Sequence, residues 1–161
     1  GCLFLEANGS PDYAVDHLPD PFPIRETHPH TVVEEWVFNI SAHPIAEGIN
    51  FTNFAPALYG RVGWGVSTTS EVAPWAEAVL VSDGRPMIVA GKYQKGRVVW
   101  SGMNLFYHAK GYRNREEARF VARILEWLGG VERVASPTFD VEFVNPQRRI
   151  ITIKELSLIH I

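Results

Sequence analysis

The stretch from Pro86 to Leu128 constrains the fold most, because it predicts a β-hairpin followed directly by an amphipathic helix. The apolar runs at 86–94 and 97–103 favour two strands. Lys95-Gly96 separates them, and a glycine there can take the positive φ of a short hairpin turn at little steric cost. The pattern therefore predicts two adjacent antiparallel strands.

A helix is predicted after the polar loop that follows this hairpin. Asn114 is a suitable N-cap, and Glu117 at the N3 position can complete a capping box. Gly129-Gly130 is a stop signal. Apolar residues recur at helical spacing at Ala118, Val121, Ile124, Leu125 and Leu128. We expect this stripe to pack on the neighbouring hairpin, so that a helix covers a sheet edge.

Other stretches rich in β-branched and aromatic residues predict further strands. They lie at 1–6, 31–40, 59–66, 77–82, 139–144 and 149–153. Asp83-Gly84 is a turn dipeptide that leads into the organising hairpin. The segment 12–30 is rich in proline, which removes backbone donors, so an extended surface loop is expected there.

Composition excludes several functions. The 161 residues are about one domain in length, and 46% hydrophobic with 20% charged residues is typical of a globular chain. A net charge of -3 argues against general nucleic-acid binding. The single cysteine, Cys2, excludes an internal disulfide and a cysteine-based zinc site. No apolar run approaches the roughly 18 residues of a membrane span.

The two ends of the sequence indicate that it is a fragment of a longer chain. Gly1 opens within an apparent buried strand, and residues 156–161 match the translation of a sequencing-library adapter. The predicted organisation is an α/β domain at 1–130, a linker at 131–137, the start of a β domain at 138–155 and the adapter scar at 156–161.

Four sequence pieces carry a family resemblance. They are Gly1-Cys-Leu-Phe-Leu, His43-Pro-Ile-Ala-Glu-Gly-Ile, the run from Gly91 to Gly102, and Ile124-Leu-Glu-Trp-Leu. Over about residues 1–130 the chain resembles the class I glutamine-amidotransferase-like domains of large membrane-attached proteins, and more distantly the ThuA-like trehalose-utilisation proteins. The resemblance implies an α/β, flavodoxin-like, mainly parallel sheet with helices flanking both faces. This domain would be N-terminally truncated and followed by the start of a β-sandwich.

The resemblance argues against amidotransferase chemistry. Active members use a cysteine on the elbow after a strand, which corresponds to Glu6-Ala-Asn-Gly here, where no cysteine stands. Cys2 lies too early for this role, and His43-Pro44 is followed by Ile45 instead of the glutamate of the active enzymes. The chain is therefore expected to be a non-catalytic module.

A ligand site is nevertheless expected beyond the carboxyl ends of the strands, where ligands bind in open α/β sheets. The candidate residues are Glu6, Asn8, Asn104, Tyr107 and His108. Glu6 and His108 could act as acid and base, which requires them to converge in one pocket. The alternative is a hydrogen-bonded cluster that holds the loops.

Three further patterns each allow a functional and a structural interpretation. Cys2 could pair with His28, His30, His43 or His108 as a nucleophile, or be a small buried residue. His28-Pro-His30, with His17, Asp16, Asp20 and Glu26 nearby, could bind a metal or be an exposed polar loop. Trp36, Trp64, Trp75, Trp100 and Trp127 could form a sugar-stacking platform or serve only in packing.

The resemblance and the empty nucleophile position together imply a non-catalytic binding or structural module whose partner is the remainder of a larger membrane-attached chain, without cofactor or metal. A small molecule or carbohydrate is the expected ligand. The alternative is a carbohydrate-active hydrolase or isomerase that uses Glu6 and His108. Sequons at Asn8, Asn39 and Asn50 suggest an extracytoplasmic setting.

Overall fold

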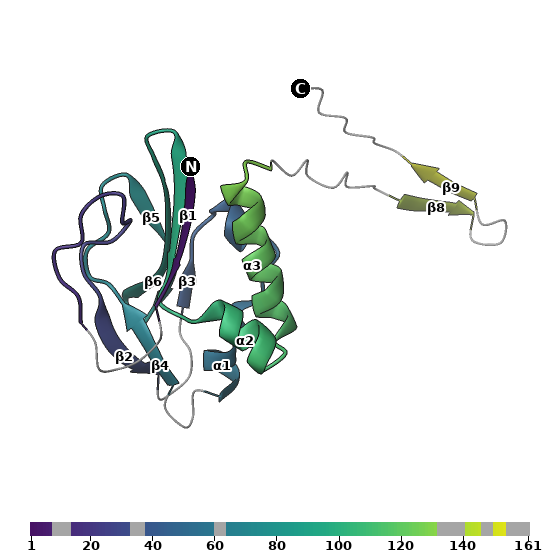
Figure 1. Ribbon diagram of the computed structural model, residues 1–161. Coiled ribbons are helices and arrows are strands. Elements are labelled where there is room, and N and C mark those ends of the chain that lie inside the picture. Colours follow the sequence, from purple (N-terminus) through teal and green to yellow (C-terminus); the bar gives the residue numbers. More distant parts are fainter. Residues whose placement is uncertain (8–13, 33–37, 60–63, 132–140, 146–149, 154–161) are drawn as a thin grey trace. The chain divides into compact units, whose positions relative to one another are not determined.

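The computed structural model describes residues 1–7, 14–32, 38–59, 64–131, 141–145 and 150–153 (Figure 1). The chain divides into two compact units, Gly1–Val131 and Glu132–Ile161. Apart from Val131, the predicted linker lies outside the described residues, as do the predicted adapter scar and Asn8.

The predicted hairpin at 86–103 is confirmed. β6 (Arg85–Tyr93) and β7 (Gly96–Ser101) pair in antiparallel register, with Val89 opposite Trp100. The turn differs from the expected one, because Gln94 has the positive φ (52°). Gly96 has another role: a Cβ there would lie 2.3 Å from the carbonyl oxygen of Gly1. This glycine allows β1 to approach β7 closely.

The predicted helix is confirmed as α3 (Arg115–Leu128), and the Asn114 side chain accepts hydrogen bonds from the N–H groups of Glu116 and Glu117. The capping box is wrong, because Glu117 is fully buried and its carboxylate binds other groups. The buried face is also rotated from the predicted stripe. Leu125 is exposed, whereas Phe120 is completely buried beside Val121, Ile124 and Leu128.

The main sheet has five strands in the order β1-β7-β6-β5-β3. Besides β6 and β7, the sheet contains β1 (Cys2–Glu6), β3 (Phe38–Ile40) and β5 (Ala76–Ser82). β1 runs parallel to β7, and each of the other neighbouring pairs is antiparallel. The predicted strands at 1–6 and 77–82 and the turn at Asp83-Gly84 are confirmed, both turn residues having positive φ.

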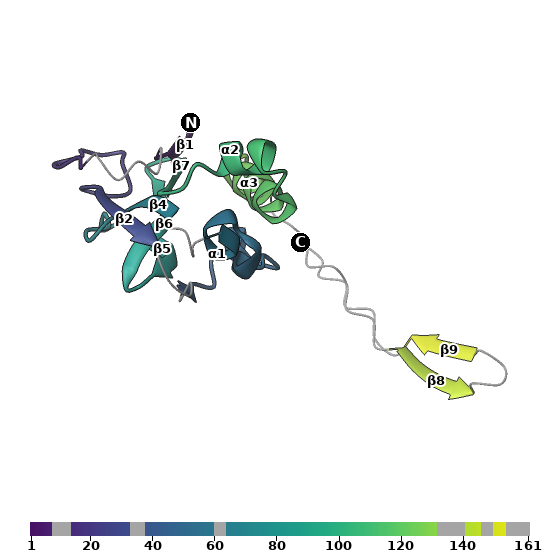
Figure 2. The same ribbon diagram turned by 90° about the horizontal axis from the view of Figure 1, so that it is seen from below.

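The flavodoxin-like expectation is therefore wrong. A mainly parallel sheet needs a long crossover between successive strands, and here short turns join β5 to β6 and β6 to β7. The helices α1 (Ala55–Tyr59), α2 (Leu105–Gly111) and α3 lie on the same side of the sheet (Figures 1 and 2). The unit is a mixed α/β structure with one helical layer.

A second small sheet pairs β2 (His28–Val32) with β4 (Trp64–Thr68) in antiparallel register. The strand predicted at 31–40 is described only at its two ends, where its first residues belong to β2 and its last residues to β3; residues 33–37 lie outside the described residues. The strand predicted at 59–66 is shifted, since Tyr59 ends α1 and the strand begins at Trp64. Along the predicted loop at 12–30, Val15 bridges Thr27 and Ile24 bridges Val72.

Both faces of the main sheet carry apolar cores. Phe4, Val99 and Ala90 belong to the cluster that packs with the helices. One position further along, Leu5, Trp100 and Val89 belong to the cluster on the other side, which also contains the fully buried Ile24. The strand period of two explains this alternation. A proline-rich segment thus takes the place of the expected second layer of helices.

In the second unit, β8 (Val141–Asn145) and β9 (Ile150–Ile153) form an antiparallel hairpin. This confirms the predicted strands at 139–144 and 149–153 in their described parts, and the β-sandwich itself stays a prediction. Within the described residues, no helix is long and apolar enough to cross a membrane.

Glu26 connects the segment before β2 with the loop after β4. Its Oε1 accepts hydrogen bonds from the Ser70 hydroxyl and backbone N–H, both at 2.6 Å, and its Oε2 lies 2.5 Å from His28 Nε2. These hydrogen bonds, that of the Ser70 hydroxyl first, lower the pKa of Glu26 from 4.5 to about 2.

We expect Glu26→Gln to lower the free energy of unfolding at pH 7 by about 1 kcal/mol, a value reduced by solvent screening. Because the folded-state pKa is depressed, the carboxylate stabilises the fold above pH 4.5, and this stabilisation is lost as the pH falls towards 2. Urea unfolding at pH 7 and pH 3 should therefore show a smaller difference between wild type and variant at pH 3. Glu71→Gln, at an exposed position of the same loop, is the control. Equal differences at both pH values would contradict this account.

Candidate functional site

At the end of β1, where a crevice is predicted, the strand contacts α2. Glu6 pairs in register with Ser101 of the parallel strand β7, so both strands end at the same edge. Its Oε1 accepts the backbone N–H of Phe106 at 3.1 Å. Asn104 caps α2, since its Oδ1 accepts the N–H of Tyr107 at 3.1 Å. These polar groups bind the first turn of α2 to the sheet.

His108 forms a buried pair with Glu117. Its Nδ1 lies 2.7 Å from Glu117 Oε1, and the side chains of His108 and Glu117 are 5% and 0% exposed. The other carboxylate oxygen accepts the N–H of Ala55 at 3.4 Å. One carboxylate thus connects α3, α2 and the start of α1. This role was not predicted from the sequence; the signal for it is an acidic residue in phase with Phe120, Val121 and Ile124 on the apolar face of the helix.

Burial raises the pKa of Glu6, which is partly covered by α2. The backbone N–H groups of Phe106 and Leu105 and the charge of His108 oppose the rise, whereas Glu117 reinforces it. Glu6, Asn104 and His108 therefore lie in one neighbourhood. Tyr107 is 58% exposed on the outside of α2.

The sequence-predicted nucleophile lies elsewhere. Cys2 begins β1 and Glu6 ends it, a separation of about 13 Å at roughly 3.3 Å per residue. Cys2 is exposed, which corrects the expectation of a buried residue, and its thiol donates to the Leu128 carbonyl at 2.7 Å. His108 pairs with Glu117 instead, near the other end of the strand.

The histidines of the proposed metal loop pair with separate carboxylates. His28 contacts Glu26, and His30 Nε2 lies 3.2 Å from Asp83 Oδ2. Among the described residues, no three histidine, cysteine, aspartate or glutamate side chains are grouped closely enough to hold a metal ion. Each of these two histidines therefore has its own carboxylate partner.

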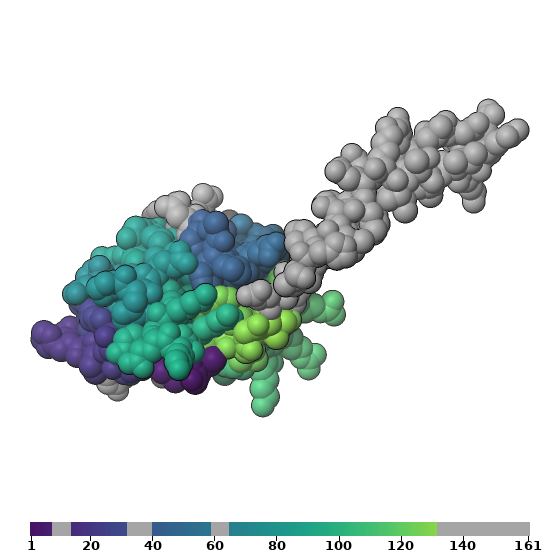
Figure 3. Space-filling view, turned by 90° about the horizontal axis from the view of Figure 1, so that it is seen from above, coloured from purple at the N-terminus to yellow at the C-terminus, as the bar shows by residue number. Residues whose placement is uncertain are grey.

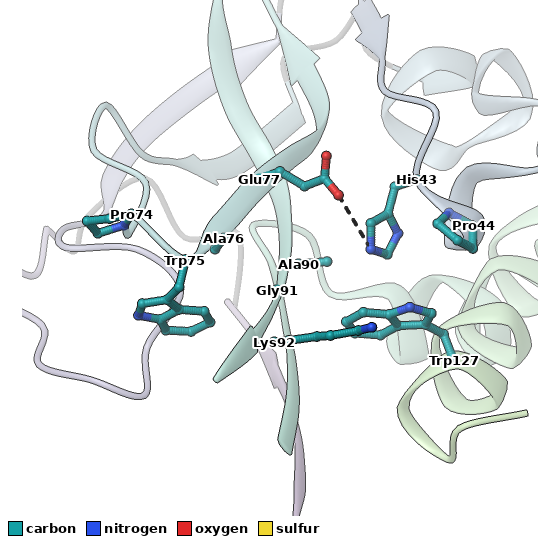
Figure 4. Close-up of a pocket in the computed structure, with 10 residues that line it drawn as sticks. All are labelled: His43, Pro44, Pro74, Trp75, Ala76, Glu77, Ala90, Gly91, Lys92 and Trp127. Carbon is teal, nitrogen blue, oxygen red and sulfur yellow. Dashed lines mark ion pairs between the residues drawn. The ribbon is translucent and has the colours of Figure 1, made fainter. Parts of the chain in front are cut away.

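A separate pocket of about 490 Å³ lies at the start of β5 (Figure 4). It is lined by residues from the β3–η1 connection, the start of β5, β6 and the end of α3. The lining includes the side chains of His43, Trp75, Glu77, Lys92 and Trp127. Figure 3 shows the corresponding segments, coloured blue, teal and light green, meeting on one face. Neither Glu6 nor His108 lines this pocket.

His43 is fixed at the rim of the pocket. It caps the short helix η1 (Pro44–Ala46), because its Nδ1 accepts the N–H of Ile45 at 3.3 Å. Its Nε2 points towards Glu77, with 3.9 Å to Oε1 (Figure 4). Burial is the main cause that lowers the pKa of His43, and the charge of Lys92 lowers this pKa further. The charge of Glu77 acts in the opposite direction, and the net effect is a lowered pKa. The neutral ring therefore carries its proton on Nε2, facing the pocket.

Each of the two pocket tryptophans is held by two contacts. Trp75 donates its indole N–H to Asp20 at 2.9 Å and packs on Tyr93, with ring centroids 5.0 Å apart. Trp127 carries the Arg97 guanidinium 5.3 Å from its ring centroid, and the His43 ring packs against it at 4.8 Å. The two indoles are thus rigid surfaces at separated positions along the pocket lining (Figure 4).

Trp75 and Trp127 are two of the five tryptophans that the sequence offers as a stacking platform or as packing residues. The fold brings these two to one pocket, whereas Trp100 is buried in the core on the sheet face opposite the helices. The side chains of Trp36 and Trp64 lie outside the described residues. A polar residue in each of two paired strands, Glu77 and Lys92, was the signal that could have indicated the site.

Comparisons with known proteins assign no family. No family model matches the chain, and no curated protein matches it. Among solved structures, the chain is similar to a cytoplasmic protein of Salmonella typhimurium, with 15% sequence identity and a TM-score of 0.43. The match covers 62% of this chain and 39% of that protein, so the chain spans about two fifths of its length.

Proposed function

We propose that the first unit is a non-catalytic binding module of a larger membrane-attached protein, as the amidotransferase-like sequence pieces imply. One observation carries the proposal: the candidate acid and base are bound within the fold, whereas the open pocket is lined by other residues. Glu6 accepts a backbone N–H of α2, and His108 is buried against Glu117. The pocket near Trp75 and Trp127 is the binding site of this proposal.

The vacant nucleophile position supports the same proposal. Glu6 ends β1 where an amidotransferase elbow would begin, and Cys2 is at the opposite end of the strand. A cysteine nucleophile needs a nearby base and an exposed reaction site. The Cys2 thiol instead donates to the carbonyl of Leu128.

A second candidate is a hydrolase or isomerase acting on a carbohydrate. It is favoured by the raised pKa of Glu6, since a carboxylic acid that keeps its proton nearer to neutral pH is a better general acid. His108 also lies close enough for its charge to act on Glu6, in the direction that lowers the Glu6 pKa. This candidate requires substrate to reach both groups, and His108 is 4% exposed.

Turnover assays separate the two candidates. We expect the full chain to release no ammonia from glutamine and to hydrolyse no p-nitrophenyl acetate above the buffer rate. We also expect Glu6→Gln and the control Glu71→Gln to behave like the wild type. Steady turnover that Glu6→Gln abolishes and Glu71→Gln preserves would overturn the binding-module proposal in favour of the enzyme.

A further inference from the structure

The pocket at the start of β5 combines aromatic surfaces with a balanced set of polar groups. Glu77 contributes a negative charge and Lys92 a positive charge, while His43 is held in its neutral form. The lining therefore has no net charge near neutral pH. Such a pocket favours a ligand that is itself uncharged and that carries both apolar faces and hydroxyl groups.

We propose that this pocket binds a neutral oligosaccharide, with one sugar ring stacked on Trp75, a second beside the indole of Trp127, and hydroxyl groups bonded to Glu77, Lys92 and His43. This inference rests on the proposed binding function and names its ligand class. The indole face is flat and apolar, and it matches the C–H face of a pyranose. The carboxylate accepts hydroxyl protons, whereas the ammonium and the His43 Nε2–H donate to hydroxyl oxygens.

The alternative ligands fit the lining less well. A quaternary or primary ammonium could stack on the indoles, but Lys92 would repel it. A phosphate or carboxylate ligand would meet Glu77, whose side chain is 60% exposed. A neutral sugar uses both charged groups as hydrogen-bonding partners without repulsion.

The rigidity of the two indoles supports binding of an extended ligand. Trp75 is fixed by Asp20 and Tyr93, and Trp127 by Arg97 and His43. Stacking surfaces that are ordered before binding lose little conformational entropy when the ligand arrives. A volume of about 490 Å³ also lies within the range of small-molecule sites.

The sheet explains why the pocket is open here. β3 pairs with β5 at Leu80, Val81 and Ser82, beyond the pocket end of the strand. Across from Ala76, Gly91 has a backbone so close that an added Cβ would lie 2.8 Å from the Ala76 Cα. A side chain at Gly91 would disturb the β5–β6 contact that carries Glu77 and Lys92.

The test is a titration of the full chain with maltotriose, cellotriose, xylotriose and N,N′,N″-triacetylchitotriose, monitored by tryptophan fluorescence and calorimetry. We expect at least one of them to bind with a dissociation constant of about 1 mM or tighter. Trp75→Ala and Trp127→Ala should each weaken this binding about tenfold or more, and Glu77→Gln several-fold. Tyr112→Ala and Glu71→Gln, at exposed positions outside the pocket, should leave it unchanged.

A second measurement follows the wild-type chain itself. In a ¹⁵N-labelled wild-type chain, the indole N–H signals of Trp75 and Trp127 should shift on sugar addition, and that of the buried Trp100 should stay in place. Absence of binding by all four sugars at about 10 mM, binding unaffected by both tryptophan substitutions, or tighter binding of the charged trigalacturonate would overturn the inference. None of these outcomes would imply turnover, so the proposed non-catalytic role is tested separately.

Discussion

Glu117→Ala is expected to lower the free energy of unfolding by about 3–5 kcal/mol, because it removes one member of a buried pair. The carboxylate of Glu117 is completely buried, lies 2.7 Å from His108 Nδ1 and accepts the N–H of Ala55. The substitution leaves buried polar groups of α2 and α1 without this acceptor. Urea unfolding of the full chain, followed by circular dichroism, measures the loss.

Glu117→Gln is the informative companion variant. Its amide oxygen can still accept one hydrogen bond and it fills the same space, so a smaller loss of about 1–2 kcal/mol is expected. Glu71→Ala, at an exposed position, should change the stability by less than about 0.5 kcal/mol. A Glu117→Ala variant as stable as Glu71→Ala would show that the three helices do not depend on this carboxylate.

Gly102→Ala is expected to cost about 3 kcal/mol or more, at the upper end for overpacking. A Cβ at this position would lie 1.8 Å from the Ser67 carbonyl oxygen. That backbone cannot move away freely, because the Ser67 N–H donates to Gly102 O at 2.8 Å and the Gly102 N–H donates to Met87 O at 2.7 Å. The glycine joins the small β2–β4 sheet to the main sheet.

Gly111→Ala is the matched control for this glycine. Gly111 ends α2, and a Cβ added there would come no closer than 3.4 Å to its nearest neighbour, the Tyr107 ring. Alanine is also a better helix former than glycine. Thermal unfolding should therefore show a large fall in melting temperature for Gly102→Ala and little change or a rise for Gly111→Ala. Equal melting temperatures for the two variants would contradict the close approach at Ser67.

Local sequence signals predicted the hairpin and helix between Arg85 and Leu128 well. Turn residues, alternating apolar positions and the Asn114 cap act over short distances, so they can be interpreted without the fold. The predicted overall topology was wrong. The family resemblance implied a mainly parallel sheet, although the hairpin predicted at 86–103 already required an antiparallel pair. The rotation of the α3 face, with Phe120 buried and Leu125 exposed, depends on tertiary packing.

The site was harder to predict than the elements. Glu6, Asn104 and His108 were expected at one edge because parallel strands end together, and the structure brings them into one neighbourhood. The pocket near Trp75 and Trp127 depends on the β5–β6 register and on how α3 packs, neither of which short-range patterns encode. Charged residues on strands were visible in the sequence, but their shared face was not.

The central claim is that the first unit binds a ligand at the Trp75–Trp127 pocket and leaves it unchanged. The most direct test is one NMR time course of the ¹⁵N-labelled full chain with the tightest-binding neutral trisaccharide, which follows protein and sugar signals together. The account predicts shifts of the Trp75 and Trp127 indole N–H signals while the sugar stays intact for a day. Cleavage or isomerisation of the sugar, or unshifted indole signals, would contradict it.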